Sequence, residues 1–155
     1  MAKHELSKAE WLDKCEAYCA RSEHCAADVR RKLCEWGAPE DLSDENGGIK
    51  PLWQEIEEIL YQRDFLNDAR FCNAYVHDKV EYQRWGRVKI QAGLRALQLP
   101  EREIQEALKN LDETVYFSNL RKLIKERKND SEEKRLRFLA QRGFTMDDIK
   151  RALHT

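Results

Sequence analysis

Apolar residues recur at helical spacing along nearly the whole chain, and the pattern itself occurs three times. Each copy has an aromatic-rich segment, then a basic amphipathic segment, then a segment that closes on Ile, Ala or Leu. No run of four or more residues alternates between apolar and polar as a strand would. The pattern predicts an all-α protein: an elongated, curved array of three tandem three-helix repeats.

The repeat has a fixed period in the second half of the chain. Leu94 and Leu139 are 45 positions apart, and so are Leu108 and Leu153. A third copy surrounds Leu33, where the frame slips by about a dozen residues through a stretch rich in Asp and Gly, which we interpret as an inserted loop. The predicted repeats are residues 8–62 with an inserted loop near 41–51, residues 63–111 and residues 112–155.

The turn after each second helix supports the alignment. Gly37 and Gly143 suit a left-handed C-cap, and Pro39 and Pro100 are expected to open the next helix at its first position. Thr145 offers a capping hydroxyl instead. Different residues therefore serve the same turn.

The composition favours small helical modules over one thick core, because 37% of the 155 residues are charged and 41% are hydrophobic. No stretch reaches the roughly 18 consecutive apolar residues of a spanning helix, and the N-terminus lacks the apolar centre of a signal peptide. We expect a cytoplasmic protein that does not enter a membrane.

Five cysteines make an odd count, and four of them lie in the first repeat without a CxxC pair. A zinc site would have to use Cys15, Cys19 and either His24 or Cys25. These residues fall within helical patterns and not in a metal knuckle, which favours reduced, packed thiols and no metal or cofactor.

The charge is distributed unevenly although the net charge is only −1. Residues 1–60 hold 8 Lys/Arg and 14 Asp/Glu, a net of −6, whereas residues 61–155 hold 20 and 15, a net of +5. Basic residues concentrate in 79–95 and 121–142. Such patches favour a polyanion or an acidic protein surface, although many charged helix faces are merely solvated.

In the middle repeat, Ile90 and Leu94 form one stripe of the second helix, while Arg87, Gln91 and Arg95 recur every four residues on another. We expect this second stripe to face outward. The turn before it contains Trp85, an aromatic that can stack on a base but more often fills the gap between helices.

The last repeat has Phe117 and Leu120 on the inner side of a helix with basic residues outside, and Asp130 is expected to cap the helix that follows. The two repeats together give twelve candidate contacts to a filament or to phosphates: Lys79, Arg84, Arg87, Lys89, Gln91, Arg95, Arg121, Lys122, Lys125, Lys128, Arg135 and Arg142.

Two segments resemble the signature of the RecX family: DFLNDARFCNAYV at 64–76, where Asn67 can cap a helix, and WGRVKI at 85–90, followed by Leu94. The resemblance extends over about residues 10–153 and includes the order of the repeats. The first repeat departs from the family pattern in its inserted loop and its cysteines.

The resemblance implies a bacterial, non-enzymatic regulator of the RecA recombinase, and we expect it to be a monomer. Such a protein binds the RecA filament on single-stranded DNA and limits its recombinase, ATPase and coprotease activities, by capping or by destabilising the filament. An array of repeats suits this task, because it can contact several protomers of a helical polymer.

Two other classes stay open at this stage. Three-helix units with a basic helix are also typical of direct DNA-binding proteins, and binding of that kind should be weak, non-specific and sensitive to salt. Support for an enzyme is thin, because the four histidines are scattered and no phosphate-binding loop or nucleophile–base pair is visible.

Overall fold

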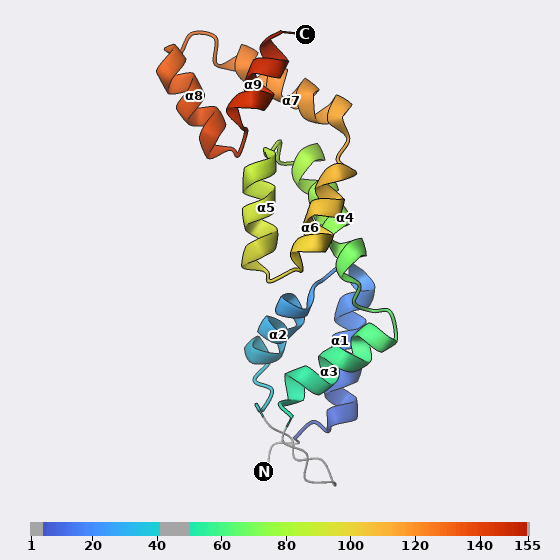
Figure 1. The fold of residues 1–155 in the computed structure, drawn as a ribbon. Coiled ribbons are helices and arrows are strands. Elements are labelled where there is room, and N and C mark those ends of the chain that lie inside the picture. Colours follow the sequence, from blue (N-terminus) through green and yellow to red (C-terminus); the bar gives the residue numbers. More distant parts are fainter. Residues whose placement is uncertain (1–4, 41–49, 155) are drawn as a thin grey trace. The chain divides into compact units, whose positions relative to one another are not determined.

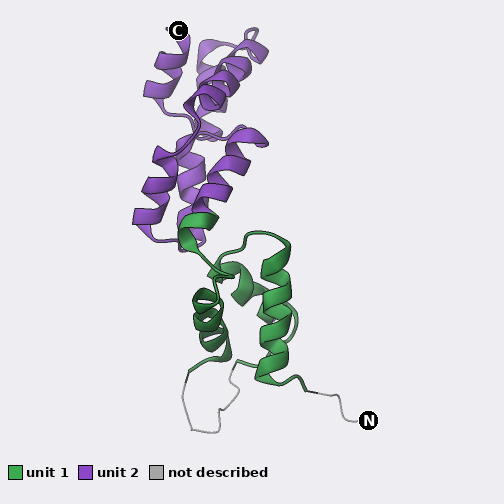
Figure 2. Ribbon diagram, turned by 90° about the vertical axis from the view of Figure 1, so that its right-hand side faces the viewer, with its two compact units in different colours: residues 1–71 green, residues 72–155 purple. Residues whose placement is uncertain are grey.

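The computed structural model describes residues 5–40 and 50–154, and all regular structure in these ranges is α-helical. The chain divides into two compact units, residues 1–71 and 72–155, which Figure 2 shows in different colours. None of the described helices is both long and apolar enough to cross a membrane. The repeat boundaries at 62/63 and 111/112 stay predictions.

The first unit contains α1 (Lys8–Arg21), α2 (Ala26–Glu35) and α3 (Leu52–Gln62), which pack against one another (Figure 1). Ser7 begins α1 with a capping box, since its hydroxyl accepts from the Glu10 amide while the Glu10 carboxylate accepts from the Ser7 amide. Buried residues from all three helices form one core, including Val29, Ile56 and Leu60.

Glu40 and Leu52 lie close together on the two sides of the inserted loop. The Leu52 amide donates to the Glu40 carbonyl over 2.9 Å. The expectation that Pro39 opens the next helix is wrong: α3 begins at Leu52, after Pro51 at the N-cap. The insertion moves this role from Pro39 to Pro51. Residues 41–49 lie outside the described part of the chain.

The next three helices are α4 (Asp68–Glu81), α5 (Arg87–Ala96) and α6 (Glu101–Lys109) (Figure 1). The prediction that Asn67 caps α4 is confirmed, because its side-chain oxygen accepts from the Arg70 amide. Pro100 occupies the N-cap of α6, one position before the place expected for it. Ile90, Leu94 and Ile104 are fully buried, and α5 packs on α6.

The last three helices are α7 (Glu113–Glu126), α8 (Glu132–Gln141) and α9 (Met146–Leu153), with α7 packed on α9 (Figure 1). Thr145 caps α9 as predicted, accepting from the Asp148 amide. The residue that caps α8 is Ser131 and not Asp130, since the Ser131 hydroxyl accepts from the Lys134 amide. The prediction found the start of α8 but placed its cap one residue too early.

The predicted left-handed C-caps are confirmed. Gly37 and Gly143 have φ of 77° and 98°, and Gln98, at the equivalent place in the middle repeat, has φ of 63°. The chain thus makes the same turn three times, with glycine at two of them.

Gly86 and Gly143 join α5 to the turn before α9. The Gly86 amide donates to the Arg142 carbonyl over 2.7 Å, and the Val88 amide donates to the Gly143 carbonyl over 3.0 Å. A Cβ atom on Gly86 would lie 2.2 Å from the backbone carbon of Gly143, so only glycine permits this approach. The contact fixes the third repeat against the second inside residues 72–155.

Candidate binding surface

The outer side of α7 carries the exposed cations Arg121, Lys122 and Lys125, and the exposed Lys128 follows in the turn after the helix. The spacing of Arg121, Lys122 and Lys125 places these three on neighbouring turns of one helix face. The opposite face is buried through residues such as Tyr116 and Leu120, which are each at most 1% exposed. Burial of one face thereby directs the cations to solvent.

Three of these cations, Lys122, Lys125 and Lys128, have no ion-pair partner among the described residues. The nearby acid Glu126 is bound instead to Arg84, with 3.1 Å between Oε1 and Nη1. We call Lys122, Lys125 and Lys128 the α7 lysine row. Their ammonium groups remain available to an anion.

Arg87 does not face outward, contrary to the prediction. Its Nε donates to Oδ2 of Asp148 over 2.9 Å, and its side chain is only 27% exposed. The Tyr116 hydroxyl donates to the same oxygen over 2.8 Å and accepts from the Arg87 amide over 3.2 Å. Arg87 is therefore part of the junction between the second and third repeats.

The electrostatics of the junction follow from this geometry. Burial lowers the pKa of Arg87, but the hydrogen bond and negative charge of Asp148 outweigh it, so the pKa is raised overall. Burial also raises the pKa of the Tyr116 phenol, which keeps this hydroxyl protonated as a donor. Arg87 and Asp148 thus carry opposite charges that neutralise each other across the junction.

Arg95 is exposed, as predicted, but it is already paired. Its Nε and Nη2 donate to the two carboxylate oxygens of Glu101 over 3.0 and 2.6 Å. These hydrogen bonds lower the pKa of Glu101 to about 2. The Gln91 amide lies beside the same guanidinium. A binding partner would have to compete with Glu101 for this arginine.

Lys79 on α4 and Lys89 on α5 approach Trp85 from two helices. Their Nζ atoms lie 4.6 and 4.4 Å from the indole centroid, within the range of cation–π attraction. Trp85 is half-buried, whereas the neighbouring Tyr82 is 76% exposed. The indole thus fills the space between α4 and α5 and holds both ammonium groups near it.

Arg142 and Arg135 have other surroundings. Arg142 donates to the backbone carbonyls of Gln83 and Arg84, so it fastens the turn before α5. Arg135 is half-buried on α8, where its Nη2 donates to the Asp130 carbonyl over 3.4 Å. The twelve predicted contacts therefore do not form one surface, and the α7 lysine row is the part most open to a partner.

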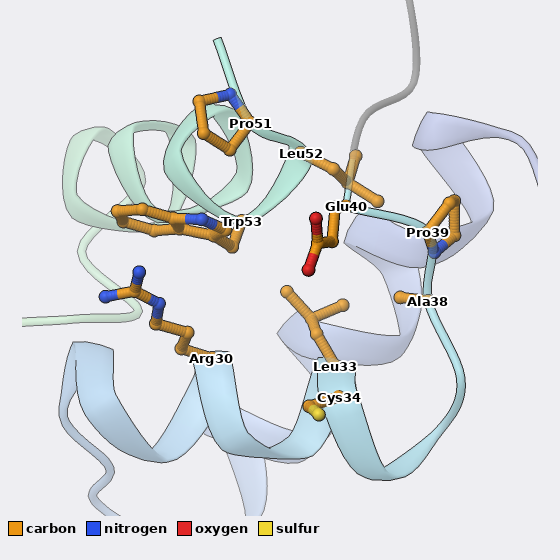
Figure 3. A pocket seen from close by; sticks show the side chains of 9 residues that line it. All are labelled: Arg30, Leu33, Cys34, Ala38, Pro39, Glu40, Pro51, Leu52 and Trp53. Atoms are coloured by element: carbon orange, nitrogen blue, oxygen red, sulfur yellow. The ribbon is translucent and has the colours of Figure 1, made fainter.

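The first unit contains an open hollow of about 590 Å³ between α2 and the start of α3. The Arg30 Cζ lies 3.6 Å from the centroid of the Trp53 ring. Figure 3 shows these two side chains at one side of the hollow, with the Glu40 carboxylate beside the opening. One stacked cation and one carboxylate on an open rim do not make a convergent polar set. The hollow lacks the features of a small-molecule site.

The cysteines are all unpaired thiols, and four of the five are buried. Burial raises the pKa of Cys15 to about 12 and the pKa values of Cys19 and Cys25 to about 11. No three His, Cys, Asp or Glu side chains of the described chain converge as a metal site would require. Cys15, Cys19 and Cys25 are therefore protonated near neutral pH.

Sequence reasoning missed Asp148, Tyr116 and Glu113, the residues that surround Arg87. Asp148 lies 61 positions from Arg87, and Glu113 approaches Arg87 to 3.8 Å and Arg151 to 3.1 Å. A single sequence contains no signal for a pair so far apart. Asp148 is nevertheless buried, with only 8% of its surface exposed.

Comparison with known proteins finds relatives of this chain. Residues 67–108 match the family model of the RecX second three-helix domain. The chain is 30% identical over 140 residues to regulatory protein RecX of Pseudomonas putida strain GB-1, covering 86% of this chain and 83% of that protein. It is 29% identical over 141 residues to regulatory protein RecX of Pseudomonas entomophila, with the same coverage.

A solved structure agrees with the fold. The crystal structure of RecX from Lactobacillus salivarius superposes with a TM-score of 0.72, at 18% identity, over 95% of this chain and 94% of that one. The structural likeness extends the match to both compact units, and the sequence identity over most of both proteins shows the kinship. This chain belongs to the RecX family of regulatory proteins.

Proposed function

We propose that this protein regulates RecA by binding the RecA filament on single-stranded DNA and limiting its recombinase, ATPase and coprotease activities. The regulation would come from capping or destabilising the filament and not from catalysis, by a cytoplasmic monomer without a cofactor. Membership of the RecX family supports the regulatory role. The filament offers phosphates and acidic side chains, the two chemistries that suit exposed lysines.

The observation that carries the proposal is the α7 lysine row. Lys122 and Lys125 lie on the exposed face of α7 and Lys128 lies in the turn that follows it, and none of the three has an ion-pair partner among the described residues. Each phosphate contact releases counterions, which makes binding of this kind favourable at low salt. An ion pair already formed inside the protein, such as that of Arg95, would contribute less because it must first be broken.

The junction around Arg87 holds the binding surface in place. The hydrogen bonds of Asp148 to Arg87 and Tyr116, and the close approach of Gly86 to Gly143, fix α7 and α9 relative to α5. A surface that is ordered before binding loses less conformational entropy on docking. The α7 lysine row is therefore held in a fixed place relative to α5.

A binding titration tests the proposal. Labelled protein is titrated with RecA filaments assembled on single-stranded DNA, at two salt concentrations, and Lys122, Lys125 and Lys128 are changed together to Gln. The matched control changes Arg102, Lys109 and Lys150 to Gln, which removes the same charge from exposed positions outside α7. We expect the α7 variant to bind at least tenfold more weakly and with a smaller dependence on salt, by about 0.7 in log–log slope for each lost phosphate contact.

Equal losses in the two variants would show that net charge and not the α7 row governs docking. The alternative function is weak, non-specific binding to DNA alone, which the same unpaired lysines also favour. Titration of bare single-stranded and duplex DNA without RecA separates the two, since the alternative requires affinity for bare DNA equal to that for the filament.

A further inference from the structure

The third repeat departs from the other two at a core position of its second helix. In the 45-residue frame, Arg135 takes the place of Ile90, and Val29 has the same place in the first repeat. Ile90 and Val29 are at most 1% exposed, so this position normally faces the core. The third repeat has a charged side chain where the others have an aliphatic one.

Arg135 opens onto an apolar groove of about 310 Å³ between α7, α8 and α9. The groove is lined by Ile124, Glu132, Arg135, Leu136, Leu139, Ile149 and Leu153. Leu153 is 61% exposed, whereas its counterpart Leu108 is 9% exposed. Leu136 is apolar where the second repeat has Gln91. The third repeat therefore has one exposed and one half-buried leucine beside the arginine where the second repeat has a buried leucine and a glutamine.

The guanidinium of Arg135 is incompletely satisfied. Its Nε atom is buried and has no hydrogen-bond partner, and its Nη2 has only the long bond of 3.4 Å to the Asp130 carbonyl. Glu132 lines the same groove one turn earlier on α8 but forms no ion pair with Arg135 in the described structure. A buried donor without a partner is costly, and a carboxylate is the acceptor that suits an arginine best.

The charges around the groove also favour an acidic partner. Lys125 follows Ile124 on α7, Lys128 lies in the turn after α7, and Lys134 precedes Arg135 on α8. All three lysines are exposed, and no described carboxylate pairs with them. Glu132 is the one acid of the lining, so the surroundings of the groove are positive overall.

We infer that the groove between α7, α8 and α9 binds an acidic, apolar segment of a RecA protomer. An apolar side chain of that segment lies among Leu136, Leu139 and Leu153, and an adjacent carboxylate accepts from Arg135. This inference rests on the proposed function. It adds a specific protein contact, beside the less specific attraction of the α7 lysine row.

Two variants remove the two halves of the contact. Arg135→Met keeps the unbranched stem and removes the guanidinium, and Leu136→Gln restores the residue of the second repeat. The matched control is Arg137→Met, on the same helix but outside the groove and paired with Glu133 at 3.1 Å. Thermal unfolding establishes that each variant folds, and Arg135→Met should be as stable as the parent because it removes a buried unpaired donor.

The direct probe is a synthetic pentapeptide, acetyl-Asp-Leu-Phe-Asp-Leu-amide, compared with the peptide that has Lys in place of both Asp residues. Backbone amide shifts of the protein are followed during each titration. We expect the acidic peptide to shift the amides of Leu136, Leu139 and Ile149, and Arg135→Met to weaken its binding about fivefold or more. The basic peptide and the Arg137→Met control should show no such effects.

Binding to RecA filaments is then measured with the same variants. We expect Arg135→Met and Leu136→Gln each to weaken docking about fivefold or more, with Arg137→Met unchanged. Docking that is undiminished in both groove variants overturns the inference but leaves the proposed function standing. A parent protein that never binds the filament overturns the proposed function, and the inference with it.

Three further outcomes would refute the groove assignment on their own. These are equal binding of the acidic and basic peptides, loss of affinity for bare DNA in Arg135→Met, and concentration-dependent self-association that Leu136→Gln abolishes. The second would assign the groove to nucleic acid, and the third to another copy of this chain.

Discussion

Replacing Arg87 by methionine should destabilise residues 72–155 although the residue lies on a basic helix. The change removes the hydrogen bond of 2.9 Å to Asp148 and leaves this carboxylate, 8% exposed, with the Tyr116 hydroxyl as its nearest remaining donor. Hydrogen bonds to charged groups contribute about 1.5–3 kcal/mol. Because the Arg87 side chain is 27% exposed, we expect a loss near the lower end, about 2 kcal/mol.

Arg95→Met is the matched comparison, because it removes the same group from the same helix. The Arg95 side chain is 55% exposed and its partner Glu101 is 51% exposed, so we expect a smaller loss of stability than for Arg87→Met. Urea unfolding followed by circular dichroism gives the stability, and amide hydrogen exchange at Ile90 and Leu94 locates the loss in the second unit. Equal, small losses in both variants would falsify the structural role of Arg87.

Three other predictions follow from single side chains. Leu94→Ala should cost about 2–5 kcal/mol in urea unfolding, because Leu94 is fully buried; a smaller loss would mean that the core can close around the missing atoms. The folded pKa of Glu101, about 2, lies below the unfolded value, so the stabilisation is present above pH ~4.3 and is lost as the pH falls through the folded pKa. Carboxyl NMR titration should show that value in the parent and a normal pKa in Arg95→Gln, and an unchanged Glu101 midpoint would exclude Arg95 as the cause. A thiol reagent at pH 8 should modify Cys34 alone in the folded protein and all five cysteines in denaturant, and rapid reaction of Cys15 would contradict its burial.

Local features of the chain were predictable because they depend on short-range geometry. The all-helical fold and the turns at Gly37 and Gly143 follow from apolar spacing and backbone freedom, and Gln98 makes the equivalent turn without glycine. The cap of α8 was predicted to within a residue, since Ser131 and Asp130 are both good capping residues, whereas the expectation that Pro39 opens α3 was wrong. The choice between two adjacent caps depends on where packing ends the helix, which local preference does not determine.

The candidate site was less predictable because its electrostatics are long-range in sequence. Helical periodicity placed Arg87 on a polar stripe, but the stripe meets Asp148 of the next repeat, 61 positions away. The same periodicity placed Lys125 outward correctly, because nothing of the described chain covers that face of α7. Periodicity therefore predicts which side chains face away from the core of their own repeat, but not which of them contact the neighbouring repeat.

The most direct test of the proposed regulation is RecA ATP hydrolysis on single-stranded DNA, measured while this protein is added at ratios well below one per RecA. Loss of most hydrolysis at such ratios, weakened by higher salt and by the loss of Lys122, Lys125 and Lys128, is the expected result. Hydrolysis that stays unchanged up to one protein per RecA would contradict the proposed regulation.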